Sequence, residues 1–425
     1  MRVLLVSGNR EDIQIRVPAL GLACIATATE RAGHDVRMLD LMAATDPQSS
    51  VIQAIEDFNP QIIGVSVRNI DDQRMSGTRF LLEQARETVA WCRKASGSPI
   101  VLGGAGFSIL PGPVLDYVDA DMGVQGEGEV VFPELLRRLE EAGVSLNGLP
   151  NFYERGRAST PRRSFPKDLD ALPLPDPSLL AAALAGAHDA PVPVQTRRGC
   201  PLSCSYCSTP TIEGKSVRRR SPETVVAWMS RWVEEGFRDF YFVDNTFNLP
   251  PSYSASLCSK IAASGMDISW RCILFPGGID GRLIEMLAQA GCKEVSLGFE
   301  SGSTRMLNGM KKSYTLQEVR NAADLLRRNH IRAMGFLLLG GPGETRESVR
   351  ESLAFAESLD LDSLKITIGV RIYPHTEVAL QAAREGLITG EQDLLFPRFY
   401  VAKGLENWLQ ETVLNCLSNK DNWTV

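Results

Sequence analysis

This sequence of 425 residues lacks a long apolar run and lacks an excess of positive charge. No stretch reaches the roughly 20 apolar residues that a transmembrane helix needs, so we expect no membrane partner. The formal net charge of −6 differs from the basic surface of a non-specific nucleic-acid binder, so we expect no nucleic-acid partner either. The start, MRVLLVSGNRED, lacks a small-residue cleavage site, and it is predicted as a first strand rather than a signal peptide.

A disulfide framework is also missing. The chain has nine cysteines, an odd number, and six of them stand singly along the sequence. This distribution favours a reducing compartment, and we expect a cytoplasmic protein. The six single cysteines are predicted to be small buried apolar side chains.

The first part of the chain, residues 1–145, alternates short β-rich runs with longer amphipathic stretches. This alternation predicts an α/β domain of Rossmann-like type, with a parallel sheet between helices. Such sheets bind ligands beyond the carboxyl ends of their strands. The predicted strands are residues 2–7, 35–40, 61–67, 99–104 and 121–126, and stretches such as 20–33 and 80–95 are predicted helices.

Proline is concentrated in residues 146–193, which have little periodicity and are predicted as a linker. The β/α alternation resumes over residues 194–380. Six βα units predict a partial (β/α)6 barrel, with its catalytic side at the carboxyl ends of the strands. The predicted strands are residues 194–198, 240–244, 268–274, 294–300, 332–340 and 364–370, and residues 381–425 are predicted as a small C-terminal segment.

Three cysteines, Cys200, Cys204 and Cys207, stand together in RRGCPLSCSYCSTP. The spacing C-x3-C-x2-C differs from a structural zinc signature, which needs a fourth Cys or His ligand. Three thiolates on one loop would instead leave one iron of a [4Fe–4S] cluster without a protein ligand. The alternative, three unrelated buried thiols, does not explain their position on a Gly- and Pro-bearing loop after the first predicted barrel strand.

This motif resembles the radical S-adenosylmethionine (SAM) superfamily, in which CxxxCxxC holds the cluster at the end of the first barrel strand. The resemblance implies that the open iron binds the amino and carboxylate groups of SAM. It also implies an electron donor such as flavodoxin or ferredoxin. Tyr206, before the third cysteine, matches the aromatic residue of the family motif and is assigned to the cofactor site.

Other barrel segments resemble family motifs residue by residue. FVDNTFN matches the segment that contacts the SAM amino group, and LGFESGS matches the one that contacts its ribose or methionine part. MGFLLLGGPGET matches the strand whose backbone holds adenine. VRIYPHTEV matches the YPGT signature with His375 in place of glycine, and its tyrosine is assigned to catalysis. The residues so implied are Asp244, Asn245, Glu300, Ser301, Gly335, Leu338 and Tyr373.

No G-x-G-x-x-G follows the first strand, which disfavours a nicotinamide-binding fold. Instead, the segments IIGVSV, VLGGAGFS and GVQGEGE resemble the cobalamin-binding domain that precedes the barrel in B12-dependent radical SAM enzymes. The implied cobalamin contacts are Ser66, Arg68, Asn69, Gly103, Gly104, Gly106, Ser108, Gly126, Glu127, Gly128 and Glu129.

The D-x-H-x-x-G motif, whose histidine ligates cobalt in related domains, is absent. His34 is predicted as a turn histidine, so cobalt should lack a protein histidine ligand. Arg68 could lie beneath the metal, where its charge would exclude a lower water ligand, and it is assigned to catalysis on this basis. The alternative is an arginine that is solvated or paired with the cobalamin tail.

The resemblance implies a methyltransferase that moves a methyl group from SAM, through methylcobalamin, to an unactivated carbon. A natural-product or tetrapyrrole-like small molecule is the expected substrate. One alternative is a cyclase, rearrangement or oxidation enzyme without methyl transfer. A second is a polar C-methyltransferase that does not cleave SAM to a radical. A non-enzymatic B12 sensor would leave the SAM-contact motifs unexplained.

Overall fold

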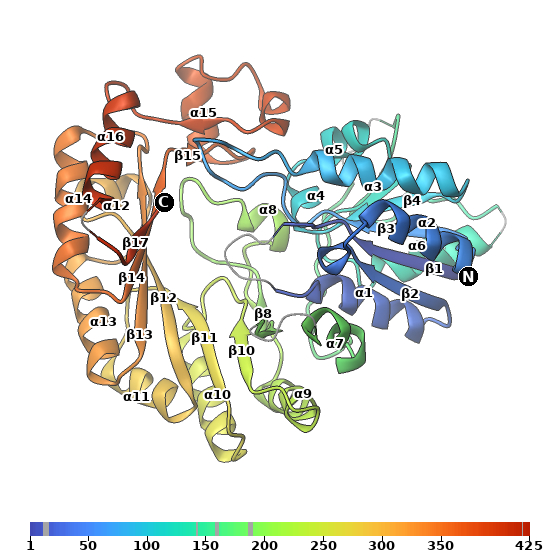
Figure 1. Cartoon of the computed structure of the whole chain (residues 1–425), viewed down its shortest axis with the longest axis horizontal. Coiled ribbons are helices and arrows are strands. Elements are labelled where there is room, and N and C mark those ends of the chain that lie inside the picture. The colour runs from blue at the N-terminus through green and yellow to red at the C-terminus, as the bar shows by residue number, and fades with distance from the viewer. Residues whose placement is uncertain (12–16, 142, 158–160, 186–189, 419) are drawn as a thin grey trace. The chain divides into compact units, whose positions relative to one another are not determined.

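The structure is a computed structural model that describes residues 1–11, 17–141, 143–157, 161–185, 190–418 and 420–425. It contains two compact units (Figure 1). Unit 1 comprises Met1–Asp72, Arg79–Val192 and Pro210–Gly214. Unit 2 comprises Gln73–Thr78, Pro193–Thr209 and Lys215–Val425.

Unit 1 is built on a six-stranded sheet with the order β2-β1-β3-β4-β5-β6. The first five strands are parallel, and β6 runs antiparallel to β5. This order places a topological switch point between β1 and β3, as in doubly wound ligand-binding folds. The predicted Rossmann-like fold is therefore confirmed. The strands are β1 (Arg2–Ser7), β2 (Asp35–Asp40), β3 (Ile62–Ser66), β4 (Ile100–Gly103), β5 (Met122–Val124) and β6 (Phe152–Glu154).

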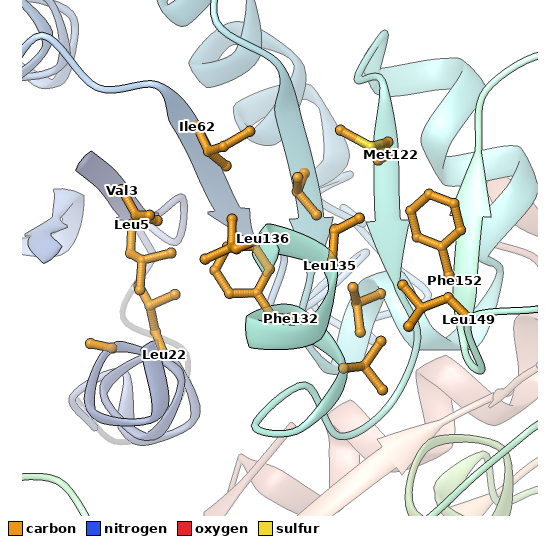
Figure 2. Close-up of a cluster of buried hydrophobic side chains, with 14 residues drawn as sticks. Val3, Leu5, Leu22, Ile62, Met122, Phe132, Leu135, Leu136, Leu149 and Phe152 are labelled. Atoms are coloured by element: carbon orange, nitrogen blue, oxygen red, sulfur yellow. The ribbon is translucent and has the colours of Figure 1, made fainter. Parts of the chain in front are cut away.

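The core of unit 1 lies between this sheet and its helices. Figure 2 shows Phe132, Leu135 and Leu136 of α6 directed at the sheet, where Leu5 of β1 and Met122 of β5 meet them. Helix α6 starts just after the predicted cobalamin turn at 126–129, so its burial fixes the end of that turn. The helices are α1 (Leu20–Arg31), η1 (Leu41–Ala43), α2 (Pro47–Phe58), α3 (Leu82–Ala95), α4 (Ala105–Ile109), α5 (Pro111–Val118), α6 (Val131–Glu140) and α7 (Pro177–Ala185).

The segment predicted as a linker contributes structure to unit 1. Strand β6 pairs with β5, and Phe152 is buried in the same core. Three residues of alternation are too few to signal a strand from sequence alone. The fully buried Asn151, which has a left-handed φ of 59°, turns the chain into this strand.

Unit 2 holds a seven-stranded sheet with the order β17-β14-β13-β12-β11-β10-β7. The parallel pairing from β10 to β14 confirms the predicted partial barrel. Strand β17 is an addition that pairs with β14 through the last residues of the chain. The strands are β7 (Val192–Val194), β10 (Asp239–Phe242), β11 (Ser269–Leu274), β12 (Cys292–Glu300), β13 (Arg332–Leu339), β14 (Ser363–Ile368) and β17 (Trp423–Thr424).

Helices alternate with these strands, and α11, α13 and α14 lie along the outer face of the curved sheet (Figure 1). The helices are α8 (Thr209–Glu213), α9 (Pro222–Glu234), α10 (Pro251–Ala263), α11 (Gly281–Gln289), α12 (Thr304–Gly309), α13 (Leu316–Arg328), α14 (Arg346–Ser358), α15 (Glu377–Arg384), η2 (Glu391–Leu395) and α16 (Glu406–Leu417). Two short ladders pair β8 (Arg197–Arg198) with β9 (Arg218–Arg219) and β15 (Val370–Arg371) with β16 (Phe399–Tyr400).

The first barrel strand differs from the prediction of one strand over residues 194–198. Strand β7 ends at Val194, and Arg197 and Arg198 pair antiparallel with β9 instead. The cause lies in Asp244, whose carboxylate accepts hydrogen bonds from the backbone amides of Thr196 and Arg197. These bonds draw the chain away from the barrel ladder before the cysteine loop begins.

Over the described residues, no helix combines the length and the apolar character that crossing a membrane requires.

Candidate functional site

The cysteine loop follows β7 and the short β8. Gly199 starts it with a φ of 87°, a left-handed conformation that favours glycine. Cys200 is buried, Cys204 and Cys207 are partly buried, and none of the three forms a disulfide. A tight turn joins the last two, since the amide of Cys207 donates to the carbonyl of Cys204 at 3.3 Å.

Backbone hydrogen bonds hold the middle of this loop on both sides. The Ser205 amide donates to the carbonyl of Met310, and the Ser205 carbonyl accepts from the amide of Val378, both at 3.1 Å. Met310 follows α12 and Val378 lies in the first turn of α15. The loop is thus fixed by elements that follow the fourth and sixth barrel strands.

Asp244 fixes the start of the loop. Its carboxylate accepts from the Thr196 amide at 2.8 Å and from the Thr196 hydroxyl at 2.6 Å. It also pairs with the buried guanidinium of Arg197 at 3.3 Å. Burial raises the pKa of Asp244, whereas Arg197 and the Thr196 hydrogen bonds lower it. This carboxylate, predicted to contact SAM, is therefore engaged by the chain that leads to Cys200.

A buried cation lies beside the cysteines. The ammonium of Lys312 is 3.3 Å from the Glu300 carboxylate and 5.0 Å from the centre of the Tyr206 ring. Burial raises the pKa of the Cys204 thiol, while the charge of Lys312 and a hydrogen bond from it lower that pKa. Lys312 therefore favours the thiolate form that cluster ligation requires.

The donor set distinguishes two kinds of metal site, a single ion and a cluster. In the parts of the chain that the structure describes, no three Cys, His, Asp or Glu side chains converge on a point where one metal ion could sit. A [4Fe–4S] cluster does not need such convergence, because each thiolate binds a different iron. Three cysteines outside any disulfide on one anchored loop, next to a buried cation, fit the cluster and do not fit a single ion.

The other predicted SAM contacts lie at the ends of the following strands. Asn245 is 3.4 Å from the hydroxyl of Thr209, which in turn accepts from the Cys207 thiol. Glu300 ends β12 with a left-handed φ of 61°, at an irregularity in the β12–β13 register. The hydroxyl of the buried Ser301 contacts that of Ser352 at 2.9 Å.

The predicted residues Gly335 and Leu338 of β13, and Tyr373 after β14, are closely packed against their neighbours. Gly335 lies so close to Leu361 that an added Cβ would be 2.6 Å from its Cδ1 atom. Leu338 and Tyr373 are both buried. His375 has a φ of 59° and its amide donates to Glu391 at 2.7 Å, so this histidine takes the left-handed conformation usual for glycine.

In unit 1, the predicted cobalamin contacts follow three adjacent parallel strands. Ser66 is the last residue of β3, and Arg68 and Asn69 follow it. The first glycine turn, at 103–106, starts at the last residue of β4, and the turn at 126–129 follows β5. The carboxyl ends of these strands lie at one edge of the sheet, so the three loops share that edge. Gly104 has a φ of 97°, and a Cβ there would lie 2.5 Å from the Val67 carbonyl oxygen.

Ser108 joins the two glycine turns. Its hydroxyl donates to the Gly104 carbonyl and accepts from the Gly126 amide, both at 2.7 Å. The Gln125 amide group donates to the Ser108 carbonyl at 2.8 Å. Glu127, Gly128 and Glu129, which complete the second turn, are buried. The turns are thus built before any ligand binds, as a preformed binding edge requires.

Arg68 and His34 occupy different places in unit 1. Arg68 is exposed in the loop after β3, and its guanidinium donates to the Val17 carbonyl at 3.0 Å. His34 precedes β2, at the opposite end of the strands, and its Nδ1 lies 3.1 Å from the N-terminal amine. His34 is the single histidine of unit 1 that the structure describes, and it lies away from the predicted cobalamin edge.

Sequence reasoning missed Lys312 and Thr196. Lys312 stands next to the exposed Lys311 in GMKKSYT, and nothing in that pair tells which lysine is buried. Thr196 was assigned to the first barrel strand, where its contact with a residue 48 positions away could not be seen. Both roles depend on tertiary contacts.

Two sequence-family profiles match this chain. The profile of the Radical SAM superfamily matches residues 194–356, and that of the B12 binding domain matches residues 8–136.

Related proteins match across nearly the whole chain. An uncharacterized methyltransferase of Pyrococcus horikoshii is 30% identical over 91% of this chain and 84% of its own length. The tryptophan 2-C-methyltransferase of Streptomyces laurentii is 26% identical over 89% of this chain and 74% of its own length. The radical SAM methyltransferase TsrM of Kitasatospora setae, solved with cobalamin and a [4Fe–4S] cluster, shares the fold with a TM-score of 0.86 and 21% identity, over 100% of this chain and 92% of that one.

Proposed function

Because the chain belongs to the cobalamin-dependent radical SAM methyltransferases, we propose that it transfers the methyl group of SAM to an unactivated carbon of a small molecule. The enzyme uses a [4Fe–4S] cluster, SAM and cobalamin. The observation that carries the proposal is the anchored loop after β7, with three cysteines outside any disulfide and the buried ammonium of Lys312 beside them.

Cys200, Cys204 and Cys207 would hold the cluster, and the bonds of Ser205 and Asp244 would keep their loop in place. The predicted SAM contacts are Tyr206, Asn245, Glu300, Ser301 and the β13 backbone from Gly335 to Leu338. When bound, the cofactors supply the electron-transfer and methyl-transfer chemistry, and the protein supplies orientation and exclusion of water.

The loops after β3, β4 and β5 would hold cobalamin through Ser66, Asn69, the two glycine turns and Ser108. An exposed Arg68 in the first of these loops supports a place beneath the corrin, where a guanidinium neither loses its proton nor acts as a good metal donor. Tyr373, buried after β14, is proposed to contact the substrate. A small acidic electron-transfer protein such as a flavodoxin or ferredoxin would reduce the cluster, in a reducing compartment such as the cytoplasm.

The acceptor is proposed to be a small molecule. The name of the tryptophan 2-C-methyltransferase supports this class, because its acceptor is an amino acid. A natural-product or tetrapyrrole-like compound belongs to the same class.

Isotope tracing tests the proposed reaction without knowledge of the acceptor. The reconstituted protein is incubated anaerobically with cobalamin, a chemical reductant and SAM that carries a trideuterated methyl group. The proposal predicts S-adenosylhomocysteine and a labelled methyl group on the extracted cobalamin, both measured by mass spectrometry. The absence of label from cobalamin, with 5′-deoxyadenosine formed, would favour a cyclase or rearrangement enzyme instead. The proposed transfer to an unactivated carbon also forms 5′-deoxyadenosine, so label on cobalamin with no 5′-deoxyadenosine would favour polar methyl transfer instead.

The place of Arg68 has its own test. If Arg68 lies beneath cobalt, replacing it with Ala admits a water ligand, and Arg68→Lys retains part of the exclusion. The electron paramagnetic resonance (EPR) spectrum of bound Co(II) should then change in the Ala variant. Methyl transfer from methylcobalamin should slow by about tenfold, one factor of ten per 1.4 kcal/mol, because a lower ligand stabilises the methylated cobalt. Identical spectra and rates in wild type and Arg68→Ala would show that Arg68 lies elsewhere.

A further inference from the structure

Arg163, a half-buried arginine of the proline-rich segment, contacts two parts of unit 1: the turn at 126–129, predicted to bind cobalamin, and α8, which follows the cysteine loop. Arg163 donates from Nη1 to the Thr211 carbonyl at 2.8 Å and from Nη2 to the Ile212 carbonyl at 3.4 Å. Both carbonyls belong to α8, which starts at Thr209, two residues after the cluster cysteine Cys207. One planar guanidinium thus holds two successive carbonyls at the end of this short helix.

The same guanidinium packs under the second glycine turn. A Cβ added to Gly126 would lie 3.1 Å from Arg163 Nη2 and 3.2 Å from the Ile212 carbonyl oxygen. Burial lowers the pKa of Arg163, while the charges of Tyr153 and Glu127 raise it. The turn predicted to contact cobalamin therefore meets α8 with Arg163 between them.

The backbone of Arg163 is itself held in place. The Asn151 side chain accepts from the Ser164 amide at 2.8 Å and donates to the Ser164 carbonyl at 2.7 Å. The Asn151 amide donates to the Arg162 carbonyl at 3.1 Å, and its carbonyl accepts from the Gln125 amide at 2.8 Å. Asn151 is fully buried, so these bonds fix residues 162–164 against the end of β5.

These contacts form one continuous path. It runs from Ser108 and the Gly126 turn through Asn151 to Arg163, and from Arg163 to the helix that continues the cysteine loop. The Arg163 side chain also lies 5.0 Å from the Phe165 ring centre, which limits the orientation of the guanidinium plane.

We propose that Arg163 is a positioning residue that ties the cobalamin turn at 126–129 to the cluster-bearing loop through α8. The proposal rests on the cofactor sites assigned above. It goes beyond them because it gives a role in the reaction to a residue of the proline-rich segment. Lysine cannot replace this function fully, because one ammonium does not span two carbonyls as the guanidinium fork does.

The test compares Arg163→Met and Arg163→Lys with Arg162→Met in the full chain. Arg162 is the matched control, since it is an exposed arginine on the same segment. Two quantities are measured in anaerobically reconstituted protein: the Kd for cobalamin, and the rate at which the chelator bathophenanthroline removes iron. Neither depends on turnover.

Arg163→Met is expected to weaken cobalamin binding by about tenfold, as the loss of hydrogen bonds from a charged donor would. Iron removal should accelerate by a similar factor, and Arg163→Lys should fall between wild type and Met on both measures. If Arg163→Met does not fold, Arg163→Lys alone tests the proposal, and it should show weaker cobalamin binding and faster iron removal than wild type. Faster iron removal with unchanged cobalamin affinity, or no difference from Arg162→Met, would overturn the proposal.

Failure of the proposed function gives a different result. If the wild-type protein bound no cobalamin, the cobalamin site itself would be wrong. If wild type and Arg162→Met bind cobalamin equally well, the cobalamin site is supported, and the Arg163 variants then test only the role of Arg163.

Discussion

At the scale of single residues, the neighbours Asp244 and Asn245 of the FVDNTFN segment have different contacts, although the motif assigns both to SAM binding. The Asp244 carboxylate is buried and satisfied by Thr196 and Arg197, whereas Asn245 contacts Thr209 near the cysteines. Asp244 therefore has the contacts of an anchor for the loop. Its assignment as a SAM contact, carried over from the family motif, stays a prediction.

Substitution distinguishes these roles. Asp244→Ala leaves the Arg197 guanidinium buried without its carboxylate, which costs about 3–5 kcal/mol, and the loop before Cys200 loses its anchor. We expect a strongly reduced iron content after reconstitution, with an intermediate loss in Asp244→Asn. Asn245→Ala should keep the iron and weaken SAM binding, measured by equilibrium dialysis. Full iron content with lost SAM binding in both Asp244 variants would make Asp244 a SAM contact.

Lys312 should tune the cluster. A buried positive charge beside Cys204 favours the reduced, more negative state of a cluster bound there. Lys312→Met should therefore shift the midpoint potential to more negative values, by on the order of 60 mV, which is a tenfold change for a one-electron couple. An EPR-monitored redox titration measures this shift. The exposed Lys311, paired with Glu377, provides the matched control Lys311→Met, which should leave the potential unchanged. Equal potentials in all three proteins would remove Lys312 from the cluster environment.

The sequence is informative about some residues of the site and uninformative about others, for a physical reason. The three cysteines can be predicted from sequence because cluster ligation requires a particular residue type at short spacing. Gly104 and Gly126 can be predicted as turn residues because left-handed turns favour glycine. Lys312 and Arg163 act through contacts with residues distant in sequence, so no local pattern marks them.

At the scale of elements, the predicted strands agree with the observed ones where periodicity alone specifies them. The runs at 2–7 and 35–40 coincide with β1 and β2, and the last five predicted barrel strands differ from the observed ones by at most two residues at either end. Strands β6 and β17 were missed, because each is two or three residues long and is defined by its partner strand. The break after β7 was missed because Asp244, far along the chain, causes it.

The turn after β13 provides a pH-dependent element. Glu344 is buried, its Oε2 accepts from the amides of Gly340 and Gly341, and burial raises its pKa to about 7 from an ordinary value of 4.5. Because the folded pKa lies above the unfolded one, folding favours the protonated acid. Its contribution to stability is complete below pH 4.5 and is lost as the pH rises through 7. The loss amounts to roughly 3 kcal/mol at about 1.4 kcal/mol per pH unit.

Glu344→Gln removes this titration. The free energy of unfolding of the variant, measured by chemical denaturation, should fall less than that of wild type between pH 5 and 8. Glu347→Gln, on the exposed first turn of α14, is the control and should follow wild type. A wild-type pH profile that Glu344→Gln reproduces would mean that Glu344 is ionised throughout this range.

At the scale of the whole molecule, the proposed cofactor sites belong to two different α/β units. The preformed edge after β3, β4 and β5 belongs to unit 1, and the anchored cysteine loop belongs to unit 2. The doubly wound sheet and the partial barrel both follow from alternating patterns, which is why the fold class could be predicted. The proline-rich segment is different: its β6, Asn151 and Arg163 join unit 1 through contacts that composition does not indicate.

The central claim is that Cys200, Cys204 and Cys207 hold a [4Fe–4S] cluster with one iron open to SAM. Its most direct test is the EPR spectrum of the anaerobically reconstituted and reduced protein, recorded with and without SAM. The account predicts a [4Fe–4S]⁺ signal that changes when SAM is added, and no such signal in the variant with all three cysteines replaced by Ala. Replacement of Cys258 or Cys416 should leave the signal intact. A cluster signal that survives in the triple variant, or one that SAM leaves unchanged in wild type, would contradict the claim.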